Sequence, residues 1–166
     1  MDFNSAKIKS DAVLSEDRVY RYALWRIWNE DRPLVMFVGL NPSTADETND
    51  DPTLRRCMGF AESWGYGGVI MANIFAYRAT DPKIMKQTEA PIGPENDEWL
   101  RKLSQEAGLV IGAWGNHGAF KQRGSDVADM LPNLHYLKMN KSGHPAHPLY
   151  LQANLKPIPM KTTGER

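Results

Sequence analysis

The chain has 166 residues, enough for one domain with a substantial core. Hydrophobic residues make up 42% of it and charged residues 24%, as in soluble globular proteins. Lys and Arg together number 20, and Asp and Glu together also number 20. This balance argues against tight, sequence-independent binding to duplex nucleic acid, although it is compatible with a local basic groove.

The cysteine content and the length of the apolar runs indicate the cellular compartment in which the protein is expected. Cys57 is the single cysteine, which excludes an internal disulfide and a metal-binding cysteine cluster and suits a reducing cytosol. Residues 1–12 are polar and charged and show no secretory signal. No apolar run approaches the roughly 18–20 residues that cross a membrane. We therefore expect a cytoplasmic protein that does not contact a membrane.

The N-terminal third predicts a polar segment followed by two strands. Residues 1–16 are expected to be a polar N-terminal segment. Residues 18–28 mix aromatic and apolar side chains with arginines, and the alternation over residues 20–24 predicts a strand. Residues 29–33 form a turn, so that strand should run antiparallel to the next. The next strand, residues 34–38, has five consecutive apolar residues, typical of a strand buried on both faces of a parallel sheet.

The rest of the chain alternates between expected helices and strands. Asp51 as N-cap and Pro52 at the first helical position predict a helix that ends near residue 64. An apolar strand follows at residues 69–72 and ends at Asn73. The later expected elements are a short helix from Asp81-Pro82, a helix at 95–105, a strand at 109–114, a helix at 120–131 and a strand at 134–137.

Strands separated by helices predict an α/β protein. We expect a three-layer α/β/α sandwich with a central, mainly parallel four-stranded sheet and an additional N-terminal antiparallel strand. Residues 17–160 would form this single domain, followed by a polar tail at residues 161–166. If the four strands are parallel, their polar exits meet at one edge of the sheet, where ligands bind in such folds. That convergence is the main functional signal.

Two asparagines at strand ends are candidate ligand contacts. Asn41 could hold a water or a ligand edge through its carbonyl and amide groups, or could cap a turn. Asn73 follows four apolar strand residues, so it either contacts a ligand or makes a structural hydrogen bond. Phe75 and Tyr77 could stack on a planar ligand or pack in the core. The remaining binding candidates are Ser43, Trp114 and Asn116.

Two histidines lie in a proline-rich segment near the C-terminus. Pro145 and Pro148 keep the residues before them extended, so the imidazoles of His144 and His147 are pre-oriented. A metal site would need a third ligand, and we expect neither a metal nor a cofactor.

Carboxylates and serines offer further chemistry. The candidate general bases are Asp46, Asp50 and Asp51, although a helix cap already explains Asp51. The chain has no Gly-x-Ser-x-Gly elbow, which argues against a serine hydrolase built on Ser43 or Ser142.

Five segments together resemble a known family. They are residues 41–46, 50–57, 73–80, 113–115 and 143–150. Their sequences and order resemble the DUF1643 family, a bacterial and phage family named only as a domain of unknown function. The resemblance extends from about residue 20 to residue 151.

The same strand ends resemble, more remotely, the uracil-DNA glycosylase superfamily. In that superfamily the first strand ends in a Gly-x-Asp/Asn-Pro motif that positions the hydrolytic water, and the second ends in an Asn that reads the base edge. The third ends in Trp-Gly, and the fourth leads to a His-Pro-Ser-Pro-Leu segment. The matching positions here are Asn41, Asn73, Trp114-Gly115 and residues 144–149. The resemblance implies a uracil-DNA-glycosylase-like fold with a pocket at the strand carboxyl ends.

The chain departs from that pattern in four ways: it has no match for the Tyr that shapes the uracil pocket, its Asp-Asp-Pro-Thr element has no counterpart, and its first and last motifs differ. Asn41 replaces the carboxylate of the most active glycosylases, so it would orient water and not deprotonate it. The last motif has an extra residue, so either His144 or His147 could be the electrophilic histidine. His147 is favoured because it directly precedes Pro-Leu.

These observations predict a DNA-glycosylase-like hydrolase of N-glycosidic bonds that acts on a modified or mispaired base, with DNA or a nucleotide as partner. The alternatives are a non-catalytic binder of a modified base or nucleotide, and a small-molecule α/β hydrolase or transferase. The catalytic candidates are Asn41, His147 and His144, and the substrate-binding candidates are Asn73, Phe75, Tyr77, Ser43, Trp114 and Asn116.

Overall fold

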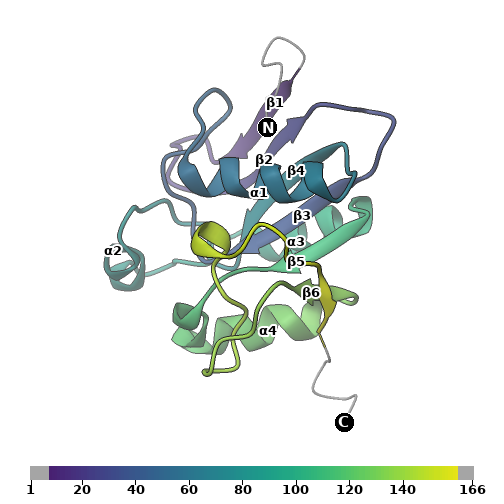
Figure 1. The fold of residues 1–166 in the computed structure, drawn as a ribbon. Coiled ribbons are helices and arrows are strands. Elements are labelled where there is room, and N and C mark those ends of the chain that lie inside the picture. Colours follow the sequence, from purple (N-terminus) through teal and green to yellow (C-terminus); the bar gives the residue numbers. More distant parts are fainter. Residues whose placement is uncertain (1–7, 161–166) are drawn as a thin grey trace.

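A computed structural model describes residues 8–160 of the chain. Within these residues, one sheet holds seven strands in the order β1-β2-β4-β3-β5-β6-β7 (Figure 1). The strands are β1 (Lys9–Leu14), β2 (Arg21–Ile27), β3 (Leu34–Gly39), β4 (Gly68–Asn73), β5 (Leu109–Gly112), β6 (Leu134–Tyr136) and β7 (Ile158–Pro159). The helices are α1 (Pro52–Ser63), α2 (Pro82–Gln87), α3 (Asn96–Glu106) and α4 (Arg123–Met130), with short 3₁₀ helices η2 (Asn116–Gln122) and η3 (Pro148–Tyr150).

The sheet is mixed. The neighbouring strands β4, β3, β5 and β6 pair in parallel. The strands β1, β2 and β7 pair antiparallel at the two sides of this group. The expected α/β class is confirmed, and the sheet is wider than the expected four strands plus one.

The strand β2 runs antiparallel to β3 as predicted, because it pairs antiparallel with β4 and β4 is parallel to β3. β2 does not pair with β3 but runs antiparallel to β4, with Leu24 opposite Met71. The backbone N–H groups of Trp28 and Asn29 both donate to the carbonyl of Gly67, which ties the end of β2 to the start of β4. Both edges of β3 are already occupied, by β4 and β5.

The predicted polar segment at residues 1–16 contains a strand. β1 forms six residues of it, and their side chains are exposed or half-buried. The backbone of β1 pairs with β2 along most of its length. Polar composition here marks an exposed edge strand and not an absence of structure. The predicted polar tail, residues 161–166, lies outside the described residues.

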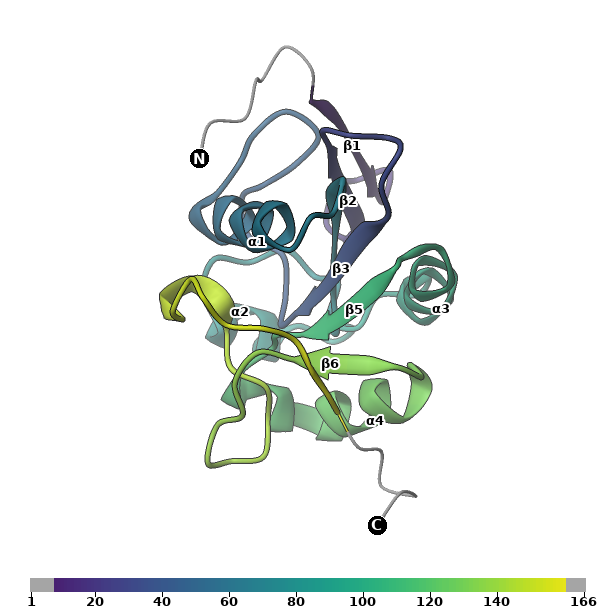
Figure 2. The same ribbon diagram turned by 45° about the vertical axis from the view of Figure 1, so that its right-hand side comes forward.

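Helices cover both faces of the sheet (Figure 2). α1 packs its buried Leu54, Cys57 and Phe60 against one face. α2, α3 and α4 pack against the other face, where their apolar side chains meet those of β3 and β4. The burial of apolar surface in these two clusters is the main source of stability. No helix within residues 8–160 is long and apolar enough to cross a membrane.

The predicted helix starts at aspartates are confirmed. Asp51 Oδ1 accepts the backbone N–H of Leu54 at 2.8 Å, and Asp81 caps α2 in the same way through Lys83. The helix expected at 120–131 is shorter, because Lys121 and Gln122 adopt left-handed backbone conformations with φ of 55° and 56°. These conformations separate η2 from α4.

The connections from β3 and β5 create a crevice. β3 leads to α1 on one face, and its neighbour β5 leads through η2 to α4 on the other face (Figures 1 and 2). Adjacent parallel strands whose connections lead to opposite faces of the sheet leave an opening at their carboxyl ends, which is the usual ligand site of open α/β sheets.

Arg26 on β2 stabilises the loop that follows this crevice. Its side chain is only 2% exposed. It donates to the Asp50 carboxylate at 2.9 Å and to the carbonyls of Asp46 and Asn49 at 2.6 and 3.1 Å. Backbone N–H donation from Thr48 holds the pKa of Asp46 at about 2, well below its ordinary value.

Replacing Arg26 therefore tests how much this loop depends on one buried cation. Arg26→Met should lower the free energy of unfolding by about 2–3 kcal/mol, because a charged donor is lost and buried carbonyls lose their partner. Arg18→Met is the matched control, since the Arg18–Glu47 pair is exposed (48% and 37%) and its loss should change stability far less than the loss of Arg26. Urea denaturation of both variants gives the comparison, and equal losses would contradict it.

Candidate functional site

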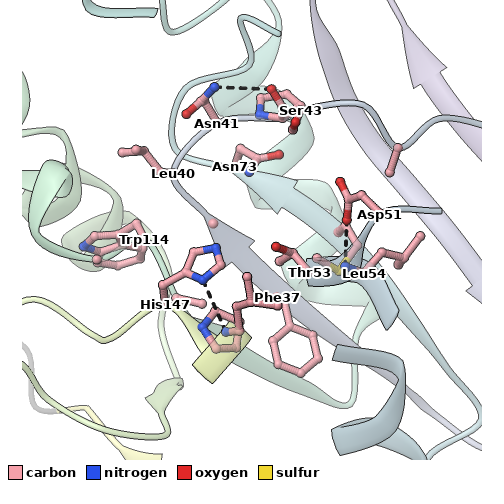
Figure 3. A pocket seen from close by; sticks show the side chains of 18 of the residues that line it. Phe37, Leu40, Asn41, Ser43, Asp51, Thr53, Leu54, Asn73, Trp114 and His147 are labelled. Atoms are coloured by element: carbon pink, nitrogen blue, oxygen red, sulfur yellow. Dashed lines mark hydrogen bonds between the residues drawn. The ribbon is translucent and has the colours of Figure 1, made fainter. Parts of the chain in front are cut away.

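A cavity of about 560 Å³ opens at the carboxyl ends of β3, β4 and β5 (Figure 3). Its volume is in the usual range for small-molecule sites. The cavity collects six of the side chains predicted as site residues: Asn41, Ser43, Asn73, Trp114, Asn116 and His147.

Asn41 lies just beyond the end of β3 and presents an acceptor to the cavity. Its Nδ2 donates to the carbonyl of Ala79 at 2.8 Å and to that of Pro42 at 3.2 Å. Because carbonyl oxygens only accept hydrogen bonds, these contacts identify the nitrogen of the amide and fix its orientation. Oδ1 is then available to accept a hydrogen bond from a ligand. Within residues 8–160, Oδ1 has no hydrogen-bond donor.

Asn73, the last residue of β4, presents donors. Its Oδ1 accepts from Arg21 Nη2 at 3.2 Å, and a guanidinium only donates. Nδ2 makes no hydrogen bond to any described residue, and it is not fully buried. Since Asn73 lines the cavity, that amide nitrogen is open to a ligand there.

His147 also presents a donor. Its Nδ1 accepts the backbone N–H of Leu149 at 3.2 Å, so the neutral ring carries its proton on Nε2. Partial desolvation lowers the pKa of His147, and the negative charge of Asp51 partly offsets this effect. The neutral ring is therefore the main form near pH 7.

Asp51 adds a carboxylate to the wall opposite β5. One of its oxygens caps α1, and the other accepts no hydrogen bond from residues 8–160. Cys57 also lines the cavity, but burial raises the pKa of its thiol far above the ordinary value. The protonated thiol is a poor nucleophile, so the reactive charge in this wall belongs to Asp51.

Trp114 and His144 form a separate pair. The Trp114 Nε1–H donates to His144 Nδ1 at 3.1 Å. A Cβ atom at Gly118 would lie 2.1 Å from the indole, so glycine is needed there for the ring to fit. The pairing turns His144 toward a second hollow of about 490 Å³, and the structure does not bring it to the cavity that holds His147.

The two predicted stacking residues do not line the cavity. Phe75 is completely buried, and its ring centre lies 5.6 Å from that of Phe120. Tyr77 contacts the ring of Tyr20 edge-on, with the ring centres 6.0 Å apart. The apolar side chains that do line the cavity include Phe37, Leu40 and Leu54.

Asn116 lies at the start of η2 and accepts from Asn140 and from Ser142 Oγ, at 2.9 and 2.6 Å. Ser43 lines the cavity and makes no hydrogen bond within residues 8–160.

Sequence reasoning missed Arg21, and it named Asp51 as a candidate general base whose presence a helix cap already explains. Arg21 lies at the start of an apolar strand, and a charge in such a run is a signal for a buried functional contact. Burial lowers the pKa of Arg21 to about 10, so the guanidinium stays charged near pH 7. Within residues 8–160, no three His, Cys, Asp or Glu side chains come together as a metal site.

Comparison with known proteins identifies one match. The family described as "Protein of unknown function (DUF1643)" matches residues 21–149. No curated protein and no solved structure matches the chain. The likeness of the strand ends to the uracil-DNA glycosylase superfamily thus rests on the residues themselves.

The lowered pKa of His147 has a measurable consequence. In an NMR titration its Hε1 signal should have a midpoint below the ordinary 6.5. On acidification the His147 ring is protonated at a higher pH in the unfolded chain than in the folded chain. Its contribution to stability is therefore complete above pH 6.5 and is lost as the pH falls from 6.5 through the lower pKa of the folded state. His147→Gln should lack this dependence. A midpoint at or above 6.5 would contradict the proposed environment of the ring.

Proposed function

The chain belongs to the DUF1643 family, and we propose that it hydrolyses the N-glycosidic bond of a nucleobase held in the cavity. One observation supports this most strongly. Asn41, Asn73 and His147 come from three separate segments, line one cavity, and each has one polar atom bound by the protein and one left for a ligand. The result is an acceptor, an amide donor and an imidazole donor with determined polarity.

The cavity suits a base attached to a sugar. A volume of about 560 Å³ accommodates a nucleoside-sized ligand, and Phe37, Leu40 and Leu54 offer apolar surface to the faces of a base. Asn73 would donate to an acceptor on the base edge. A base in a duplex must first be flipped out at a cost of a few kcal/mol, which favours mispaired, modified or single-stranded substrates.

His147 would assist departure of the base. As the bond between the sugar carbon and the base nitrogen breaks, its electron pair moves to the base and the sugar becomes cationic. The Nε2–H of a neutral imidazole can donate to an oxygen on which the negative charge of the base accumulates. Because Leu149 N–H holds Nδ1, the donor does not need to reorient during the reaction.

Asn41 would orient the attacking water, and Asp51 would accept its proton. Asn41 Oδ1 can accept a hydrogen bond from a water and orient it, but an amide cannot take its proton. The water oxygen bonds to the sugar carbon, the released proton goes to Asp51, and it finally reaches the departed base through solvent. The products are the free base and a sugar with a hydroxyl at the former bond. The carboxylate would also stabilise the cationic sugar.

The order of the strand-end residues also supports this function, because it resembles that of the uracil-DNA glycosylase superfamily. The proposal departs from that likeness by assigning the proton to Asp51, at the start of α1. The test is a set of oligonucleotides with modified or mispaired bases, analysed for abasic sites and free base. Binding without base release would identify a non-catalytic base-binding module.

Removal of His147 should slow base release and leave the fold intact. His147→Ala should lower the rate by about 10²–10³-fold, the usual effect of deleting one donor to a developing negative charge. His135→Ala is the control, because His135 lies on β6 and does not line the cavity. Unchanged turnover in His147→Ala, on a substrate that the natural sequence cleaves, would exclude this role.

Asp51→Asn separates catalysis from helix capping. Asn caps helices as well as Asp does, so the free energy of unfolding should change by less than about 0.5 kcal/mol. Base release should fall by at least about 10²-fold, because the proton acceptor is lost. The matched control is Asp81→Asn, another capping aspartate followed by proline, which does not line the cavity. Equal activities of the two variants would contradict the role of Asp51.

A further inference from the structure

A lysine on α2, Lys86, lies beside the cavity and contacts a histidine at its rim. Lys86 Nζ lies 2.9 Å from Nδ1 of His117, an exposed residue that lines the cavity. Because an ammonium only donates hydrogen bonds, Nδ1 accepts, and the neutral ring of His117 carries its proton on Nε2. Lys86 therefore fixes the tautomer of His117 and leaves an N–H donor for a ligand at the rim.

Lys86 is held in place although no carboxylate pairs with it. Its side chain is half-buried, and Nζ lies 5.4 Å from the ring centre of Phe120. The ion pairs within residues 8–160 all involve other cations. Fixing a long side chain costs conformational entropy, so an ordered ammonium without a counter-ion needs an explanation. A bound anion provides one, because the ammonium has three N–H donors and His117 accepts only one of them.

The charges inside the cavity also favour an anion at this end. Among the described residues that line the cavity, Arg21 carries a positive charge and Asp51 a negative charge. These two side chains interact electrostatically, so their charges offset each other. The charge of Lys86 then remains as a positive excess at the rim, where it attracts an anionic group of a ligand.

The cavity has an apolar end and a polar rim. The apolar side chains belong to the cluster between the sheet and α1 and include Leu24, Phe37, Leu54 and Met71. At the rim, the Ala79 N–H donates to the carbonyl of Pro42 at 2.9 Å, which brings Ser43 and Thr80 side by side. Neither hydroxyl makes a hydrogen bond within residues 8–160. This division suits a ligand with a planar apolar part and an anionic polar part.

We propose that Lys86 and His117 bind a phosphate on the sugar of the ligand, so that the cavity takes nucleotides in preference to free nucleosides. The inference rests on the proposed function for the nucleobase at the apolar end, but it does not depend on cleavage of the bond. Phosphate oxygens would accept from Lys86 Nζ and His117 Nε2 in charge-assisted hydrogen bonds. Both residues lie outside the strand-end positions that resemble the uracil-DNA glycosylase superfamily. The phosphate has two possible sources, the terminal group of a free nucleotide and a diester within a strand.

An NMR titration with inorganic phosphate tests the anion site without any base. The Hε1 signal of His117 should shift and saturate, whereas that of His135, on β6 and away from the cavity, should not. Lys86→Met keeps an apolar stem over Phe120 but lacks the charge, and it should abolish the shift. Lys121→Met is the matched control and should keep the shift, because Lys121 Nζ lies 5.5 Å from the centre of the same ring but makes no hydrogen bond to a cavity residue within residues 8–160. An equal shift in Lys86→Met, or none in the natural sequence, would overturn the inference.

Calorimetry with matched ligands tests the selection. Each of the four common 2′-deoxynucleosides is compared with its 5′- and 3′-monophosphates. The better of the two monophosphates should bind about 10-fold or more tightly than the nucleoside, as expected for a hydrogen bond to a charged group. This preference should disappear in Lys86→Met and persist in Lys121→Met. The inference fails if no monophosphate binds, or if none binds more tightly than its nucleoside.

A trinucleotide without terminal phosphates separates the two sources. If Lys86→Met weakens its binding, the rim takes a diester of a strand. If Lys86→Met weakens only the monophosphates, the rim takes the terminal phosphate of a free nucleotide. An effect on neither would overturn the inference. Phosphate-dependent binding without base release would support the inference and contradict the hydrolase, whereas base release that is equal in Lys86→Met and the natural sequence would do the reverse.

Discussion

The contact between Arg21 and Asn73 is the interaction on which the site depends. A guanidinium buried at the end of an apolar sheet is costly unless acceptors surround it. Arg21 has two, and its Nε is buried with no partner among the described residues. Such an incompletely satisfied cation is tolerated where it serves a site, because it gives Asn73 a single orientation. The same contact connects β2, which lies outside the parallel strands, to the end of β4.

The position of the cavity follows from the order of the strands. β3 lies in the middle of the sheet and leads to α1 on one face, whereas its neighbours β4 and β5 lead to helices on the other face, so side chains at the ends of three strands surround one opening. Strand ends are rigid places for such groups, because the sheet holds their backbone. α1 adds Asp51 from its first turn, and the segment before η3 adds His147 from the far end of the chain. The site is thus assembled from contacts that are distant in the sequence.

Much of the fold could be predicted from local patterns, and the failures have physical causes. Apolar runs marked β3 and β4, and Asp-Pro pairs marked α1 and α2, because burial and capping act locally. The pairing of β2 depends on β4, far along the chain, and the first half of β1 is polar and exposed because β1 is an edge strand. Phe75 follows a strand end as a ligand contact would, yet packing against Phe120 buries it. Whether an aromatic residue packs in the core or lines a cavity is decided by distant neighbours, which no local pattern reveals.

The two histidines of the proline-rich segment show how one distant contact separates equivalent candidates. Both precede a proline, and both have a Nδ1 that accepts a hydrogen bond. The donor to His144 is the indole N–H of Trp114, and His144 lines the second hollow. The donor to His147 is the backbone N–H of Leu149, two residues later in the chain. The local donor holds Nδ1 of His147, which lines the first cavity, and leaves its Nε2–H for a ligand there. One polar atom of each of His147, Asn41 and Asn73 is hydrogen-bonded within the protein. The cavity therefore has a fixed pattern of donors and acceptors before any ligand binds. An electrostatically assisted reaction requires this preorganisation.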